Sequence, residues 1–301
     1  MVLNMEPDLE VEVLPHEHGL MIKEIIFGRM GLTRGLMRRV YHGGQVTLNG
    51  QHAFITQRVK AGDWIRIAFG DEPTDIKPQP LDLDIVYEDS SIVVVNKPPH
   101  MAVHPTRTYP DGTLANGLAY HWQQQGLVSK IRLLHRLDRD TSGLVVVAKE
   151  PYAYQQLVKQ LRGRTLKRTY LAIVSGRLQH RTGIIDQPIG LSGQGHGLKR
   201  AVIAEGKPAR THFRVLAEYQ FGSLLELELA TGRTHQIRVH LAWMGHPVIG
   251  DEMYAQSSNW IGRQALHAWR LRFAHPRTNQ PMELRAPLPD DMRLPLKNWL
   301  Q

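Results

Sequence analysis

An aspartate with arginines on both sides stands shortly before the apolar run 144–148. Asp138 has Arg136 two residues before it and Arg139 directly after it. Residues 140–143 have the composition of a turn, since Asp and Ser bond the local backbone and Gly accepts a positive φ. One interpretation is an arginine–carboxylate pair that fixes a loop. The other is a catalytic carboxylate, kept ionised by arginines and carried on a loop at the edge of a sheet.

A second cluster of basic side chains, residues 233–240, follows an expected strand. We predict a helix there, with Thr234 as its N-cap and with Ile237 and Leu241 on its apolar face. Arg238 lies one turn into this helix on another face and leans toward the positive N-terminal end. Such a corner can receive an anion, whereas an ordinary surface helix would leave the cluster unexplained.

The first segment, His135-Arg136-Leu137-Asp138, resembles the H-R-L-D signature of the RluA-type pseudouridine synthases. The resemblance implies that Asp138 is the catalytic residue that attacks the target nucleotide. It also implies that Arg136 enters the nucleic-acid stack as the base leaves, and we assign His135 to substrate binding.

Three further segments resemble motifs of the same family. The helix segment resembles G-R-T-H-Q-I-R-x-H-L, which implies that Arg238 pairs with Asp138 and that Arg233 makes a phosphate or structural contact. Residues 167–172 resemble K-x-Y-x-A, which implies that Tyr170 stacks on the target uracil, and we assign Lys167 to substrate binding. Residues 96–105 resemble N-K-P-x-G-x-x-V-H-P, with a histidine at position 100 where the family usually has glycine.

The chemistry that the resemblance implies is isomerisation of uridine to pseudouridine in RNA, with large-subunit ribosomal RNA as the first candidate substrate and transfer RNA as the next. Glycoside hydrolysis normally uses two carboxylates, but here no water enters and the base is recaptured, so one suffices. Asp138 could attack the sugar or take its 2′ proton, and the sequence leaves both open. The stacked base must first be flipped out, at a cost of about a few kcal/mol.

Two other classes of function remain open from the sequence. A non-catalytic, ribosome-associated RNA-binding protein would explain the basic segments but not a carboxylate placed among arginines. An RNA or DNA N-glycosylase would share base flipping but would release free base and need activated water. Isomerisation leaves the mass of the RNA unchanged, whereas release of a free base does not.

Composition narrows the chemistry further. The chain has no cysteine, which excludes disulfides, thiolate zinc sites and cysteine nucleophiles. We expect no metal, because His235 and His240 are five residues apart rather than four, and no nucleotide cofactor, because G-x-G-x-x-G and Walker-type loops are absent. No apolar run approaches the roughly 20 residues of a membrane span and no signal peptide opens the chain, so we expect a cytoplasmic protein, and a monomer.

Net charge is +9, and its distribution favours a polyanionic partner, namely nucleic acid. Residues 18–70 hold eight Lys or Arg against two acids, and residues 151–185 hold seven against none. Within the first block, two short helices, a hairpin turn at Asn49-Gly50 and a strand at 64–69 resemble an S-four-type RNA-binding domain. That resemblance places Arg34, Arg38, Arg39 and Asn49 at the RNA.

We predict a small α/β RNA-binding domain at residues 1–72 that includes an acidic tail, a Pro-rich linker at 73–80 and a catalytic domain at 81–301. Short links between expected strands favour an α+β catalytic domain, built on a mainly antiparallel mixed sheet with flanking helices. The expected strands are at 83–87, 92–95, 145–148, 167–174, 211–217, 224–229, 264–273 and 282–286, and helices at 152–161 and 290–300.

Overall fold

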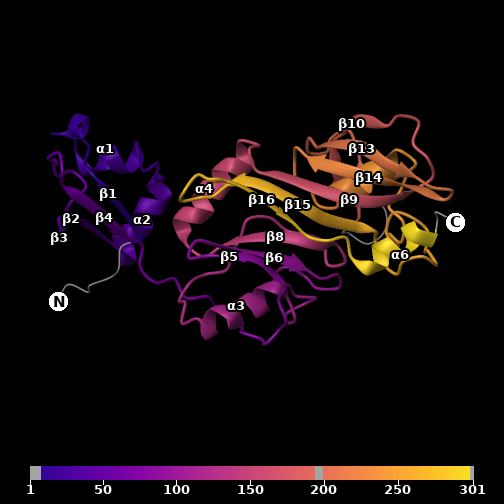
Figure 1. The fold of residues 1–301 in the computed structure, drawn as a ribbon, viewed down its shortest axis with the longest axis horizontal. Coiled ribbons are helices and arrows are strands. Elements are labelled where there is room, and N and C mark those ends of the chain that lie inside the picture. The colour runs from indigo at the N-terminus through magenta and orange to yellow at the C-terminus, as the bar shows by residue number, and fades with distance from the viewer. Residues whose placement is uncertain (1–7, 194–198, 299–301) are drawn as a thin grey trace.

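The computed structural model describes residues 8–193 and 199–298, and its first part is a four-stranded antiparallel sheet with two helices. The strands run in the order β1-β4-β2-β3. The elements are β1 (Leu9–Glu12), a 3₁₀ turn (Pro15–Glu17), α1 (Ile22–Phe27), α2 (Arg34–Gly43), β2 (Gln45–Leu48), β3 (Gln51–His52) and β4 (Trp64–Ala68). In Figure 1 this part is the indigo body at the N-terminal end, set apart from the rest of the chain.

Local sequence signals account for this small unit. The hydroxyl of Thr33 accepts a hydrogen bond from the amide of Leu36 (3.2 Å), so Thr33 is the N-cap of α2. Asn49 and Gly50 both have positive φ, as the short hairpin between β2 and β3 requires. The helices and the sheet enclose their own hydrophobic core, which is centred on Ile22, Ile65 and their neighbours.

The rest of the chain is built on a ten-stranded sheet. Eight of its strands run in the order β10-β13-β14-β9-β15-β8-β6-β5, and outside this order β16 pairs with β15 and β7 pairs with β8. Its strands are β5 (Ile85–Glu88), β6 (Ile92–Lys97), β7 (Arg132–Leu133), β8 (Ser142–Ala148), β9 (Lys167–Ser175), β10 (Thr182–Asp186), β13 (Arg210–Glu218), β14 (Gly222–Leu229), β15 (Leu266–Ala274) and β16 (Pro281–Arg285). The helices are α3 (Leu114–Gln124), α4 (Pro151–Arg162), α5 (Gln236–Trp243) and α6 (Asp290–Asn298), and β11 (Ile189–Leu191) pairs with β12 (Arg200–Val202). Every strand pair of the large sheet is antiparallel except β8 with β15, so the predicted α+β class and mainly antiparallel mixed sheet are confirmed.

Helices cover both faces of the sheet around β6 and β8. Val93 and Val145 belong to the core that contains Leu118 of α3, whereas Val94 belongs to the core that contains Leu157 of α4. Figure 1 shows α3 and α4 on opposite sides of these strands. A strand buried on both faces carries a continuous apolar run instead of an alternating one, which explains the sequence of β8.

The parallel pairing of β8 with β15 depends on Gly143. Its φ is +112°, and a Cβ at this position would lie 2.3 Å from the carbonyl oxygen of Ala268. Glycine therefore lets the start of β8 approach the backbone of β15. The pairing places the segment before β15 beside the loop that carries Asp138.

The start of helix α5 differs from the prediction. The N-cap is His235, in a left-handed conformation (φ 57°), and not Thr234. The side-chain oxygen of Gln236 accepts the amide hydrogen of Arg233 (3.0 Å), so a glutamine inside the helix stabilises the turn that Thr234 was expected to cap. The predicted N-cap was therefore wrong.

Two sets of contacts join the small unit to the large one. The side chain of Gln155 on α4 accepts from the amide of Thr33 (2.8 Å) and donates to the carbonyl of Gly31 (2.9 Å). Glu72 bonds Arg39 of α2 and also the buried Arg132 at β7. In the described part of the chain, no helix is long and apolar enough to cross a membrane.

Candidate active site

A pocket of about 310 Å³ opens between the loop before β8, strand β9 and the start of α5. Its lining brings together most of the site residues predicted from sequence: His135, Arg136, Asp138, Tyr170, Arg233 and Arg238. Lys167 is not part of this lining. Its ammonium group pairs with Glu228 (2.8 Å) beside an adjacent depression.

The centre of the pocket is an arginine held between two aspartates. Arg238 is 6% exposed and donates from NH1 to Oδ2 of Asp138 (2.9 Å). Its Nε and NH2 donate to the two oxygens of Asp251 (2.7 and 2.8 Å). Burial alone would lower the pKa of Arg238, but hydrogen bonds and charge from Asp251, and then from Asp138, raise it above its ordinary value. The guanidinium is therefore a permanent cation fixed in orientation.

Asp251 is a site residue that sequence reasoning missed. It is 1% exposed and takes the two guanidinium nitrogens that Asp138 does not. Its bidentate contact leaves NH1 of Arg238 directed at Asp138, so the second carboxylate orients the pair without facing the pocket itself. The only local signal is an acidic residue directly after the apolar segment 248–250.

Tyr170 and His135 supply apolar surface and neutral groups to the pocket. Tyr170 on β9 is 4% exposed, and burial raises the pKa of its phenol, so the hydroxyl keeps its proton. Burial, with a smaller contribution from Arg168, lowers the pKa of His135 to about 3. The Nδ1 atom of His135 is buried without a hydrogen-bond partner in the described structure. The side chain of Arg136, by contrast, is exposed at the rim.

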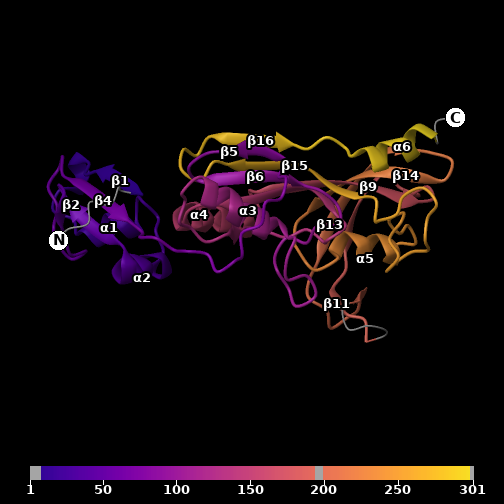
Figure 2. The same ribbon diagram turned by 90° about the horizontal axis from the view of Figure 1, so that it is seen from below.

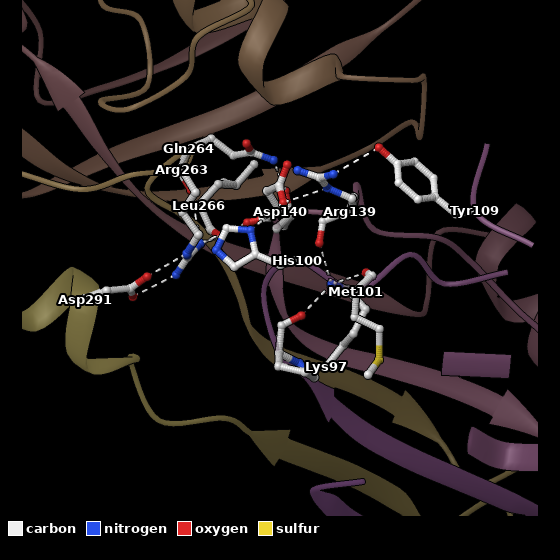
Figure 3. Close-up of polar contacts among 12 residues, drawn as sticks. Lys97, His100, Met101, Tyr109, Arg139, Asp140, Arg263, Gln264, Leu266 and Asp291 are labelled. Carbon is white, nitrogen blue, oxygen red and sulfur yellow. Dashed lines mark hydrogen bonds and ion pairs between the residues drawn. The ribbon is translucent and has the colours of Figure 1, made fainter. Parts of the chain in front are cut away.

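A buried lysine bonds the carbonyl of Arg139, the residue after Asp138 (Figure 3). Lys97 at the end of β6 is fully buried, and its Nζ donates to the carbonyl oxygens of Pro98 (2.7 Å), Met101 (2.8 Å) and Arg139 (3.0 Å). Burial lowers its pKa to about 7. The lysine thereby joins the 98–101 turn to the residue directly after Asp138.

Arg263 supports the same loop from the β15 side (Figure 3). It bonds both oxygens of Asp291 on α6 (2.6 and 2.8 Å) and donates from NH1 to the carbonyl of Asp140 (3.1 Å). The side chain of Asp140 accepts in turn from Arg139 (2.9 Å) and lies 2.8 Å from Nδ1 of His100. Contacts from two distant segments, one at residues 97–100 and one at residue 263, therefore fix the backbone that follows Asp138.

Gln236 organises the opposite wall. Its side-chain oxygen accepts from the hydroxyl of Thr231 (2.8 Å) and the amide of Arg233, while its Nε2 donates to the carbonyl of Arg210 and the hydroxyl of Thr211 (both 3.0 Å). Arg233 itself is exposed and donates from Nε to the carbonyl of Pro208 (3.0 Å). The turn before α5 is thus bound to β13, which sets where Arg238 enters the pocket.

The residues predicted to contact RNA lie far from this pocket, on the small unit. Arg34 and Arg38 are exposed on α2 and have no ion-pair partner in residues 8–193 or 199–298, whereas Arg39 pairs with Glu72 (3.3 Å). The exposed side chain of Asn49 bonds two groups of the same unit, the carboxylate of Asp63 and the amide of Trp64 (both 2.8 Å). No group of three or more metal-ligating side chains occurs among the described residues.

Comparison with known proteins identifies the family of this chain. Residues 91–243, about half the chain, match the family described as RNA pseudouridylate synthase. The uncharacterized RNA pseudouridine synthase YjbO of Bacillus subtilis (strain 168) is 39% identical over 88% of this chain and 94% of its own length. Ribosomal large subunit pseudouridine synthase D of Haemophilus influenzae (strain ATCC 51907 / DSM 11121 / KW20 / Rd) is 38% identical over 94% of this chain and 92% of its own.

A solved structure shows the same relationship. Human RNA Pseudouridylate Synthase Domain Containing 1 superposes with a TM-score of 0.57 at 30% identity, over 72% of this chain and 86% of that one. The site geometry, the family match and the extent of these similarities lead to one conclusion. The chain belongs to the RNA pseudouridylate synthase family and is an isomerase.

Proposed function

We propose that this protein isomerises specific uridines to pseudouridine in large-subunit ribosomal RNA and that Asp138 is its catalytic carboxylate. The observation that carries the proposal is the Asp138–Arg238 pair at the centre of a pocket whose lining contains no other acidic residue. Several similar proteins are named ribosomal large subunit pseudouridine synthase D, which supports this RNA as the substrate.

A single carboxylate in the pocket lining suits isomerisation better than hydrolysis. Glycoside hydrolases place two carboxyl groups about 5–10 Å apart across the sugar. One protonates the leaving group, and the other attacks the sugar or activates water. Here the second carboxylate, Asp251, is buried and bound through both oxygens to Arg238. Asp138 alone can attack the sugar or take its 2′ proton, and the cleaved uracil is then rebound through carbon five.

Base flipping would deliver the uridine to this pocket. A base in structured RNA is stacked, so the enzyme must compensate for about a few kcal/mol when it extrudes one. Arg136 is exposed at the pocket rim, where its guanidinium can replace the lost stacking, and Tyr170 presents an apolar ring inside. Arg233 lies on the same rim and can contact a phosphate.

The remaining predictions concern binding and organisation. We propose that residues 1–72 form an S-four-type RNA-binding domain, that 73–80 link it to a catalytic domain at 81–301, and that Arg34, Arg38, Arg39 and the hairpin at Asn49 face RNA. Separate hydrophobic cores in the two units support the division. We also propose that the enzyme acts in the cytoplasm as a monomer, where it meets ribosomal RNA.

Mapping pseudouridines tests the proposal. Purified protein is incubated with an unmodified large-subunit ribosomal RNA transcript, and pseudouridines are mapped in parallel in RNA from a deletion strain. We expect one or a few sites to gain pseudouridine in vitro and to lack it in the strain, with RNA mass unchanged. Release of free uracil would indicate a glycosylase. Binding without product would indicate a non-catalytic protein, and sites only in transfer RNA would replace the proposed substrate.

A further inference from the structure

A histidine at the start of α5 faces Asp138 from a constrained backbone position. His235 adopts φ 57° and ψ 19°, a left-handed conformation that costs a non-glycine residue about 1 kcal/mol or more. Its Nε2 lies 3.9 Å from Oδ2 of Asp138, and its side chain is mostly buried in the pocket wall. This separation of Nε2 and Oδ2 is too long for a direct hydrogen bond. One oxygen atom beside the two can lie within hydrogen-bond distance of both.

Two contacts of Tyr254 bear on which nitrogen of His235 carries the proton. The amide of Arg200 on β12 donates to the phenol oxygen of Tyr254 (2.9 Å). The phenol O–H is then free to donate to Nδ1 of His235, which lies 2.9 Å away. With the phenol as donor, Nδ1 is the acceptor and Nε2 carries the hydrogen, directed toward the carboxylate of Asp138, which can only accept. Figure 2 shows β11, the partner strand of β12, projecting on the side of the sheet where α5 lies.

The electrostatics agree with a neutral ring. Burial lowers the pKa of His235, and the nearby Arg238 acts in the same direction, although Asp138 opposes it. Above that pKa the imidazole has one donor, Nε2–H, while an ionised Asp138 offers only acceptors. A group bound between them must accept a hydrogen bond from one and donate to the other.

Only one part of a uridine inside an RNA chain meets this requirement. The uracil carbonyls only accept and the ring N–H only donates, and the 3′ and 5′ oxygens of the ribose are esterified. The 2′-hydroxyl both donates and accepts, and it is also the group that distinguishes RNA from DNA. We propose that His235, in the tautomer set by Tyr254, binds the 2′-hydroxyl of the target ribose together with Asp138. This inference rests on the proposed function, and it makes His235 a specificity-determining residue.

The tautomer can be tested in the free protein without RNA. Histidine side chains are labelled with ¹⁵N, and the resonances of His235 are assigned by their loss in His235→Gln. We expect the Nε2–H tautomer in the wild type and a mixture of tautomers in Tyr254→Phe, which lacks the phenol hydrogen. A dominant Nδ1–H tautomer in the wild type would overturn the assignment.

Binding of the 2′-hydroxyl is tested by combining protein and RNA changes. Two competitor oligonucleotides carry pseudouridine or 2′-deoxyuridine at the mapped target, and the ratio of their inhibition constants is measured. The two competitors also differ in their base. This difference contributes the same factor to the ratio for every protein variant, so it cancels when the ratios of two variants are compared. In His235→Asn, which tolerates the left-handed backbone but is too short to reach, we expect the preference for the hydroxyl to fall about threefold to tenfold, as for one neutral hydrogen bond.

Two further variants complete this experiment. His235→Gln keeps a side-chain N–H and should retain part of the preference, whereas His180→Asn, at an exposed loop histidine, should match the wild type. An unchanged ratio in both His235 variants would overturn the inference while the wild type still formed pseudouridine. Failure of the proposed function would look different, because the wild type would then form no pseudouridine in any RNA.

Discussion

Arg238 in the pocket and Arg34 and Arg38 on α2 carry the same charge in opposite surroundings. Arg238 is buried and bonded to two aspartates, so its position is fixed before any substrate arrives. Arg34 and Arg38 are exposed and have no ion-pair partner in the part of the chain that the structure describes. Buried, fixed charges suit chemistry, because they need no reorganisation when the reaction occurs. Exposed, mobile charges suit affinity for a polyanion, because they release counterions from it.

The same contrast appears in how each region is built. The loop of Asp138 is supported by Lys97, by Arg263 and by the parallel pairing of the nearby Gly143 with β15, so each support involves a distant part of the sequence. The small unit is held by its own core and meets the large one through polar contacts at Gln155 and Glu72 and through Tyr152 of α4, which packs against that core. Substitutions in the first region should therefore change turnover or folding, and those in the second should change binding.

The largest effect is expected for Asp138→Asn. An amide keeps the shape of the side chain but supplies no carboxylate to attack the sugar or take a proton, so pseudouridine formation should fall by more than about 10³-fold. Binding should stay within about threefold, because phosphate contacts made elsewhere dominate affinity. Single-turnover product formation and filter binding on one RNA measure both quantities. Product at near wild-type rate would remove Asp138 from the mechanism.

Arg238→Lys should be the next most severe change. Lysine keeps the charge but cannot bond both oxygens of Asp251 and also reach Asp138, so we expect about a hundredfold loss of single-turnover rate and about 1–3 kcal/mol loss in the free energy of unfolding. Urea unfolding and turnover at saturating protein provide the two readouts. The exposed Arg272→Lys serves as control and should change stability by less than about 0.5 kcal/mol. Full activity in Arg238→Lys would show that catalysis does not need one guanidinium bonded to both Asp138 and Asp251.

Lys97→Met should reveal a pH-dependent contribution to stability. The pKa of Lys97 falls from 10.5 to about 7 on burial, so between these values the unfolded chain binds a proton that the folded chain has released. The free energy of unfolding of the wild type should therefore rise with pH in this window relative to Lys97→Met, by up to about 1.4 kcal/mol per pH unit. Below pH 7 both states bind the proton, and the difference should be constant. Urea unfolding from pH 6 to 10 measures this difference, with the exposed Lys130→Met as control. If the difference in the free energy of unfolding between wild type and Lys97→Met does not vary with pH, the buried lysine does not release its proton near pH 7.

The smallest effect is expected for the double change Arg34→Gln, Arg38→Gln. Log K falls as log salt concentration rises, and each arginine that neutralises a phosphate contributes about 0.7–0.9 to the steepness of this fall. The slope should therefore become shallower by at most about two. Stability should hardly change, because both side chains are exposed. Arg66→Gln is the matched control, since Arg66 is exposed in the same unit but already paired with Glu10 (3.1 Å). An unchanged slope would show that this face of α2 does not contact RNA.

Elements with local signals could be predicted from sequence. The hairpin of β2 and β3 follows from Asn49-Gly50, helix α2 from its N-cap Thr33, and β8 from a continuous apolar run. Helix α3 was not predicted, because most of its side chains are buried and it lacks a clear polar face. The N-cap of α5 was predicted wrongly, because the long-range bonds of Gln236 override the local preference for Thr234.

The site shows the same limit. The pairing of Arg238 with Asp138, 100 residues apart, was expected only through the resemblance to a family, and the structure places the two side chains in contact. Asp251 and Tyr254 were missed, since their importance comes from tertiary contacts with Arg238 and His235 and not from neighbouring sequence. Lys167 was placed near the substrate by its motif, but in the structure it pairs with Glu228 outside the pocket lining.

The most direct test of the separation between chemistry and affinity is single-turnover pseudouridine formation at saturating protein, at low and at high salt. On one ribosomal RNA fragment, wild type, Asp138→Asn and the Arg34→Gln, Arg38→Gln variant are compared. We expect no product from Asp138→Asn at either salt concentration, although this variant binds the RNA fully at low salt. We expect a wild-type rate from the double-arginine variant once the RNA is saturated, with a higher protein concentration needed to reach saturation. Product from Asp138→Asn, or a reduced rate at saturation in the double-arginine variant, would contradict this separation.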